Sequence, residues 1–241
     1  MEEEIAVASE EFEVENAGVV LRGTRSSAAG TAAADQIDAV LMIHGACVDR
    51  SFFAAAACEL ARRFDVHIYD RRGYSESALP TDGSEGVDCS VAVQAEDAAA
   101  IIRALGGGAP MHVVAHSGGC TIALELAARH PELVRRVILD EPLFIDCLPA
   151  GTAFEKNTQR IHGALEEGNL SLALHLFMPT IGASDPRSRS EHETPIDLFR
   201  ANTDYFIRCE YVPMSTYVPD YEALRGADLR VLSSELDHGE Q

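Results

Sequence analysis

The sequence has little positive charge. Its 19 lysines and arginines stand against 39 aspartates and glutamates, which gives a formal net charge of −20 at pH 7. Because nucleic acids and anionic membrane surfaces are recognised through Lys and Arg, this balance argues against both kinds of partner. Acidic residues crowd the first fifteen positions. We expect residues 1–11 to form a solvated acidic leader that runs into the first strand.

Metal-binding and targeting patterns are also missing. The six cysteines show neither a CxxC pair nor the spacing of zinc ligands, so we expect neither a metal nor a cofactor. The N-terminus has no basic region followed by an apolar run, as a secretory signal would have. No stretch is long and apolar enough to span a bilayer. A cytoplasmic location with reduced thiols is the expectation that follows.

What the sequence does contain is an alternation of strand and helix patterns. A length of 241 residues is enough for one domain with a large core. A hairpin is expected around Asn16-Ala-Gly18, followed by helices at 51–63 and 90–105. Short apolar runs predict the strands at 37–44, 64–69, 111–116, 137–139 and 228–234. This order predicts an α/β fold with a mostly parallel sheet and helices on both faces.

The alternation fails between Leu143 and Gly226, where helical patches are separated by polar stretches that contain proline. We interpret residues 143–226 as a helical cap inserted into a core that spans residues 12–142. Residues 227–241 then supply a last core strand and a loop.

Polar clusters follow the predicted strands. In a parallel sheet the carboxyl ends of the strands lie along one edge, where ligands bind. We therefore expect one site at that edge, built from five clusters: His44-Gly45, Asp70-Arg71, Ser117, Asp140-Glu141 and Glu235–Asp237.

The stretch from Met111 to His130 is the most informative part of the chain. It predicts a short buried strand, a tight turn that carries Ser117, and an amphipathic helix. A serine on such a turn, with small residues at Ala115 and Gly119, is typical of a nucleophile elbow.

Three motifs give the chain a resemblance to the α/β-hydrolases from Phe12 to its end. They are His44-Gly45-Ala46, the stretch from Tyr69 to Ser75, and Ala115-His-Ser-Gly-Gly119, and they occur in the family's order. The elbow departs from the usual Gly-x-Ser-x-Gly pattern because Ala115 stands first. The resemblance implies acyl transfer, with Ser117 as the nucleophile and the backbone N–H groups of Ala46 and Gly118 as the oxyanion hole.

The resemblance further implies a bacterial type of hydrolase that cleaves an ester or another acyl bond of a small, apolar molecule under the cap. Two alternatives remain. The chain is a non-catalytic binding protein of the same fold, or it has a cofactor-free haloperoxidase-like activity, which shares the serine triad.

Two carboxylates are candidates for the acid of the triad. Ser234-Glu-Leu-Asp237 resembles the Gly-Glu-Leu-Asp that carries the family's acid after the late strand. Some members place the acid one strand earlier, which nominates Glu141 in preference to Asp140. Geometry decides which group serves in a triad, so both Asp237 and Glu141 stay open here.

The histidine is harder to place. In the family it follows a further strand, about two dozen residues after the acid, but four residues follow Asp237 here. None of the nine histidines occupies the expected position. We expect His116 to point away from the Ser117 hydroxyl and His44 to be a structural residue. The expectation is that the chain stops before its last strand, base and helix. The alternative is that His238 serves with Glu141.

Overall fold

The computed structural model describes residues 5–30, 38–79, 88–142, 144, 150–181 and 194–233. Within these ranges, one sheet has the strand order β1-β2-β4-β3-β5-β6-β7. From β4 to β7 all neighbours are parallel, whereas β2 is antiparallel to both β1 and β4. The predicted α/β fold with a mostly parallel sheet is confirmed. The strands are β1 (Val7–Asn16), β2 (Val19–Ala28), β3 (Ala39–Ile43), β4 (Asp65–Tyr69), β5 (Met111–His116), β6 (Val134–Asp140) and β7 (Leu229–Leu232).

The predicted N-terminal hairpin is present as β1 and β2. Ala17 and Gly18 join the strands with φ angles of +47° and +77°, as a tight hairpin turn requires. The strand begins at Val7, however, so the expectation that the leader extends to residue 11 is wrong. Residues of this acidic stretch pair with β2, where Glu10 forms an ion pair with Arg25 at 3.0 Å. The strand was expected to begin at Phe12. Its acidic side chains face solvent.

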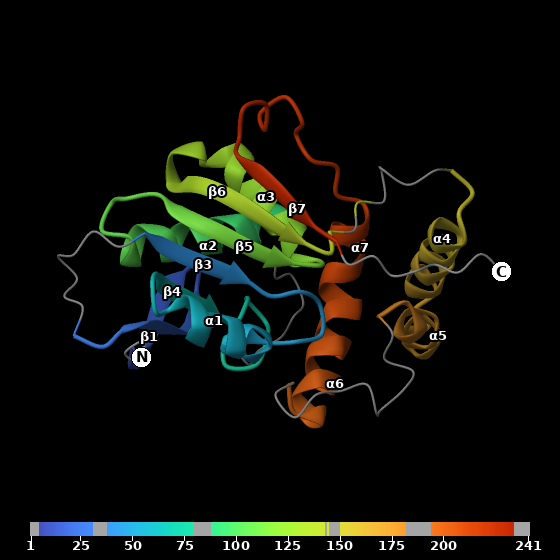
Figure 1. Ribbon diagram of the computed structural model, residues 1–241. Helices are drawn as coiled ribbons and strands as arrows, with labels where there is room; N and C mark the ends of the chain where they lie inside the picture. Colours follow the sequence, from blue (N-terminus) through green and yellow to red (C-terminus); the bar gives the residue numbers. More distant parts are fainter. Residues whose placement is uncertain are drawn as a thin grey trace.

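Helices cover both faces of the sheet (Figure 1). On one face, α2 (Val91–Leu105) and α3 (Gly119–Arg129) bury Leu41 and Ile43 of β3. On the other face, the short 3-10 helix η1 (Arg50–Phe53) and α1 (Ala54–Leu60) cover Val40 and Met42. Alternate side chains of a strand point to opposite faces, which explains why β3 is apolar throughout. Helix α2 begins as predicted, because the side chain of Ser90 accepts a hydrogen bond from the Val93 N–H.

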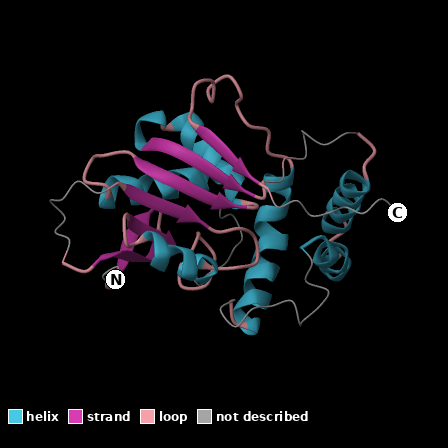
Figure 2. Ribbon diagram, viewed as in Figure 1, coloured by secondary structure: helices cyan, strands magenta, loops and turns pink. Residues whose placement is uncertain are grey.

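Between β6 and β7 the described chain forms helices in residues 153–181 and 196–215, and turns and loops elsewhere. A 3-10 turn, η2 (Pro131–Leu133), precedes β6. After β6 come α4 (Ala153–Glu166), α5 (Leu170–Phe177), η4 (Met178–Ile181), α6 (Ile196–Tyr205), the π-helix η6 (Phe206–Glu210) and α7 (Tyr211–Ser215). In Figures 1 and 2, α6 to α7 stand between the sheet and the pair α4 and α5. None of the helices in the described ranges is long and apolar enough to cross a membrane.

The carboxyl ends of the parallel strands point toward the α6–α7 helix (Figure 1). Four of the five predicted polar clusters lie along this edge, because β3, β4, β5 and β6 are mutually parallel and end at Ile43, Tyr69, His116 and Asp140. The fifth cluster, Glu235 to Asp237, lies outside the described residues. For these four clusters the predicted convergence is confirmed.

The start of α3 packs directly on the end of β3. A Cβ atom on Gly119 would lie 2.5 Å from the Ile43 carbonyl oxygen and 2.7 Å from that of His44. Both neighbours are backbone atoms, so neither can rotate away. The side chain at position 119 must therefore be absent for the elbow to sit against β3.

We predict that Gly119→Ala lowers the free energy of unfolding by about 1–3 kcal/mol, since backbone must shift to admit the methyl group. Gly163→Ala is a matched control, because nothing lies within 4 Å of that Cβ position in α4. Removing a helical glycine there is expected to stabilise by up to about 1 kcal/mol. Urea unfolding of the two variants measures both effects. Equal effects of the same sign would contradict the close approach at Gly119.

Candidate active site

Ser117 lies on the sharp turn between β5 and α3. Its φ angle is +49°, a left-handed conformation that costs energy for any residue except glycine. Two backbone bonds of 2.9 Å hold it there, from the Ser117 N–H to the Asp140 carbonyl and from the Cys120 N–H to the Ser117 carbonyl. Ala115 is fully buried and pairs with Ile43 and Leu139 across the sheet, so alanine fits this position of the elbow. The predicted strand, turn and helix are all present.

The loop after β3 lies directly against Ser117. A Cβ atom on Gly45 would be 3.1 Å from the Ser117 Cβ, and one on Gly118 would be 3.8 Å from the Ala46 backbone nitrogen. Ser117, Gly118 and Ala46 therefore come together, although nothing in the fold itself assigns them roles. The N-terminus of α3 adds the positive end of a helix dipole to this place, which favours an anion.

Met214 of α7 also lies against Gly118. Its sulfur would lie 3.2 Å from a Cβ atom on Gly118, which brings α7 into contact with the elbow. Met214 is buried in a cluster that also contains Phe177, Phe206 and Tyr211. The one side chain of the helical segment that is shown against Gly118 is thus apolar. No sequence motif indicated Met214 as a neighbour of the elbow.

His44 has a structural role, as expected. It is fully buried, and burial together with the charge of Arg71 holds its pKa well below the usual value. The Arg71 N–H donates to its Nε2 at 3.1 Å, so the proton of the neutral ring is on Nδ1. Nδ1 then donates to the Gly45 carbonyl at 2.8 Å. Both ring nitrogens are occupied in holding the loop that carries Ala46.

His116 and Asp140 are hydrogen-bonded to each other at the ends of β5 and β6. The two residues are opposite each other in the parallel ladder, and His116 Nδ1 lies 2.8 Å from an Asp140 carboxylate oxygen. The His116 ring also stacks on Phe52, with centroids 4.4 Å apart. Asp140 thus binds the elbow twice, through its carboxylate to His116 and through its carbonyl to Ser117.

The two candidate acids differ in what is described. Glu141 directly follows the carbonyl that accepts the Ser117 N–H. Its φ angle is +49° and its own N–H donates to the Leu232 carbonyl of β7 at 2.9 Å, so the backbone turns sharply at the strand end. Asp237 lies outside the described residues. The position of Glu141 at the sheet edge agrees with its nomination.

Four other described histidines contact groups other than Ser117. His192 and His238 lie outside the described residues. The pairs are His67 with Asp65, His112 with Asp38, His130 with Glu96, and His162 with the Ser215 hydroxyl at 2.7 Å. The last pair joins α4 to α7, which the sequence did not reveal.

A buried ion pair supports the loop after β3 that carries Gly45 and Ala46. Arg71 follows β4 and donates from both terminal nitrogens to Glu210 of η6, at 3.0–3.1 Å. The same guanidinium bonds Gln94 of α2 and, at 3.2 Å, the Gly45 carbonyl. The Tyr74 hydroxyl donates to Glu210 at 2.7 Å, and its ring lies under the guanidinium. The structure thus ties η6, α2 and the loop at Gly45 to one cation.

Burial and pairing act in opposite directions on these charges. Burial raises the pKa of Glu210, and the charge of Arg71 and the Tyr74 hydroxyl counteract it. Burial alone would lower the pKa of Arg71, but Glu210 reverses the effect and keeps the guanidinium charged. Ion pairs also tie the neighbouring residues of this loop, since Asp70 binds Arg50 and Arg72 binds Asp97.

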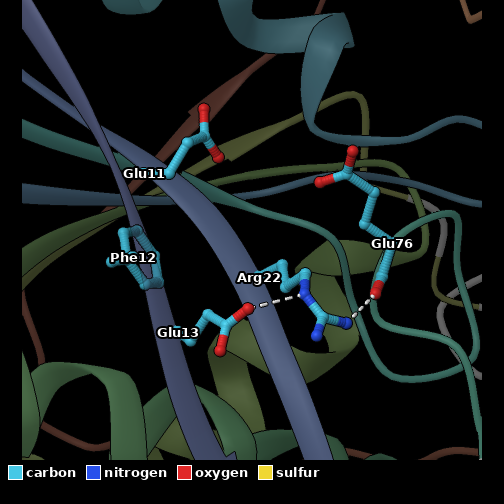
Figure 3. Close-up of a pocket in the computed structure, with 5 residues that line it drawn as sticks. All are labelled: Glu11, Phe12, Glu13, Arg22 and Glu76. Carbon is cyan, nitrogen blue, oxygen red and sulfur yellow. Dashed lines mark hydrogen bonds and ion pairs between the residues drawn. The ribbon is translucent and has the colours of Figure 1, made fainter.

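A surface hollow of about 450 Å³ lies elsewhere, on the N-terminal hairpin (Figure 3). Within the hollow, Arg22 forms an ion pair with Glu13 at 2.9 Å and donates a hydrogen bond to the Glu76 carbonyl at 2.7 Å. The residues that line the hollow are Glu11, Phe12, Glu13, Arg22 and Glu76, and none of them is a predicted site residue. Within the described ranges, no three His, Cys, Asp or Glu side chains are grouped as metal ligands would be.

Comparison with known proteins identifies the family. The alpha/beta hydrolase fold family matches residues 38–213, so the chain belongs to it. The uncharacterized hydrolase YraK of Bacillus subtilis (strain 168) is 28% identical over 77% of this chain and 65% of its own length. A pimeloyl-[acyl-carrier protein] methyl ester esterase of Chromobacterium violaceum is 33% identical over 61% of this chain and 56% of its own. The chain therefore spans less than two thirds of these relatives.

A solved structure agrees on the fold. An alpha/beta hydrolase from Sphaerobacter thermophilus DSM 20745 has a TM-score of 0.60 and 21% identity, and 93% of each chain is covered. At this identity the likeness concerns the fold alone.

We predict that Glu210→Gln lowers the free energy of unfolding by roughly 3–5 kcal/mol, because it leaves the Arg71 charge buried without its partner. Glu222→Gln is the control, since Glu222 pairs with Arg225 while both side chains are 76–77% exposed. A change within about 0.5 kcal/mol is expected there. Thermal or urea unfolding gives both values, and a mild Glu210→Gln would argue against an ionised buried pair.

Proposed function

We propose that the chain is a serine hydrolase that cleaves an ester or another acyl bond of a small, apolar molecule. Ser117 is the nucleophile in this proposal, and the N–H groups of Ala46 and Gly118 form the oxyanion hole. The observation that carries it is the strained Ser117 on the β5–α3 turn, with the Ala46 nitrogen beside Gly118. A left-handed serine held by two backbone bonds is a costly arrangement, which is typical of functional sites.

The chemistry follows from where charge develops. The Ser117 Oγ attacks the carbonyl carbon, its proton passes to a base, and the carbonyl oxygen becomes an anion. The N–H groups of Ala46 and Gly118, together with the N-terminus of α3, stabilise that anion. Removal of one such donor costs roughly 2.7–4 kcal/mol in the best measured case. The tetrahedral species then expels the alcohol, and water releases the acyl group from Ser117.

Two observations support an apolar acyl substrate. The apolar side chain of Met214 lies against Gly118. One of the relatives is named as a methyl ester esterase. An ester with an apolar acyl chain fits both.

The acid is Asp237 or Glu141, as the sequence left it. Asp140 is already bound to His116, which supports its exclusion. His44 is buried with both nitrogens bonded, so it is not the base. If Glu141 is the acid, His238 is the histidine of this chain that we propose as base.

A fluorophosphonate probe tests the nucleophile. We expect covalent labelling of the purified chain at Ser117, and loss of the labelled peptide in Ser117→Ala. Ser215→Ala is the matched control, because Ser215 of α7 bonds a histidine, His162, but lies outside the elbow. Labelling of this control is expected to stay within about twofold. An unlabelled wild type that binds apolar esters without turnover would favour the non-catalytic alternative, and halogenation by peroxide and halide would favour the haloperoxidase-like one.

The acid is tested by Asp237→Asn and Glu141→Gln, with hydrolysis of a short p-nitrophenyl ester as the assay. Replacing the acid of a serine triad by its amide lowers kcat by about 10⁴. With His238 as the base of this chain, we expect such a loss in Glu141→Gln and a change below about threefold in Asp237→Asn. His238→Gln is expected to be inactive only if Glu141 is the sensitive residue. Insensitivity of both carboxylates would contradict a triad built from this chain.

A further inference from the structure

Two cysteines that are distant in the sequence meet where the helical segment packs on the core. Cys89 precedes the N-cap of α2 and is buried, with 6% exposure. Cys209 lies on η6 and is partly exposed. The Tyr205 hydroxyl donates to the Cys89 sulfur at 3.3 Å, and Cys209 follows Tyr205 by four residues in the same helical segment, which brings the two thiols within hydrogen-bonding reach. A thiol from the core is therefore in contact with a thiol from the segment between β6 and β7.

The environment of this pair differs from that of the other described cysteines. Hydrogen bonds from Cys209 and Tyr205 outweigh burial and lower the pKa of Cys89, whereas the pKa of Cys209 is raised by the same contact. Burial raises the pKa of Cys47 to about 12 and that of Cys120 further. Thiolates, and not thiols, react with oxidants. Cys89 has the character of the attacking sulfur, and Cys209 is placed to resolve it.

We propose that Cys89 and Cys209 are a modification site at which hydrogen peroxide forms a disulfide between the core and η6. The Cys89 thiolate attacks one peroxide oxygen, the O–O bond breaks, and Cys89 sulfenic acid and hydroxide form. The Cys209 sulfur then attacks the Cys89 sulfur, the S–O bond breaks, and the hydroxyl leaves as water with the proton of Cys209. In sum, two thiols and one peroxide give one disulfide and two waters.

The bond would act on the buried ion pair beside it. Glu210 follows Cys209 in η6 and holds Arg71, which in turn holds the Gly45 carbonyl. A disulfide at Cys209 fixes η6 to the segment before α2, so Glu210 cannot leave Arg71 by movement of the helix. The proposal concerns thiol chemistry alone and is independent of the role of Ser117.

The test treats the fully reduced chain with a small excess of hydrogen peroxide and maps its peptides without reduction. We expect one linked peptide that joins Cys89 to Cys209, loss of two titratable thiols, and a Tm higher by several degrees. Dithiothreitol should reverse all three. Alkylation of both cysteines after peroxide, or linkage of either to Cys147, Cys58 or a second chain, would overturn the proposal.

Two variants separate the attacking sulfur from the resolving sulfur. In Cys209→Ser the reaction should stop at the sulfenic acid, so that dimedone labels Cys89 and the Tm does not rise. Cys58→Ser is the control at an exposed cysteine and should behave as the wild type does. If Cys209→Ser does not fold, the peptide map of the wild type still decides. Dimedone on Cys209 or Cys58 in place of Cys89 would contradict the assignment of Cys89 as the attacking sulfur.

Discussion

The contact between Arg71 and Glu210 is the interaction on which the geometry around Ser117 depends. Both side chains are buried, at 1% and 0% exposure, and removing two charges from water is costly. Further hydrogen bonds to the two side chains offset part of this cost, although the Nε of Arg71 has no partner among the described residues. Gln94, Tyr74 and the Gly45 carbonyl supply those bonds. The pair is thus stable only when α2, η6 and the loop after β3 are all in place.

The same network fixes the direction of a predicted oxyanion donor. The Gly45 carbonyl accepts two hydrogen bonds, from His44 Nδ1 and from Arg71 Nη2. That carbonyl and the Ala46 N–H belong to one planar peptide unit and point in opposite directions. Holding the oxygen therefore aims the N–H the other way, without any contact to the N–H itself. A donor that is oriented before substrate arrives needs no reorganisation during the reaction.

Features that rest on neighbouring residues could be predicted from the sequence. The hairpin turn at Ala17-Gly18, the N-cap at Ser90 and the strand–turn–helix at Ser117 each depend on local backbone preferences. The convergence of strand ends followed from the parallel order alone. Glu210 could not be found this way, because its partner Arg71 is 139 residues away and no spacing connects them.

The start of β1 could not be predicted from the sequence because glutamates occupy much of this strand. A run of glutamates is typical of a solvated segment, yet in an edge strand one face is solvated as well. Glu10 and Glu11 are therefore compatible with a strand when Arg25 and Thr24 stand opposite. The meeting of Cys89 with Cys209 was hidden for the same reason as Glu210. It is a contact between a core segment and a helix that only packing brings together.

Two histidines, His44 in the loop after β3 and His116 next to Ser117 in the chain, each hold a neighbouring group in place. His44 holds the Gly45 carbonyl, and His116 holds Asp140, whose own carbonyl accepts the Ser117 N–H. Asp140 therefore holds the elbow at two points. Its carbonyl accepts the N–H of Ser117, whose φ angle is strained, and its carboxylate bonds His116. A carboxylate that is committed to His116 is poorly placed to orient a catalytic base as well. This contact supports the proposal that the acid is Glu141 or Asp237 in preference to Asp140.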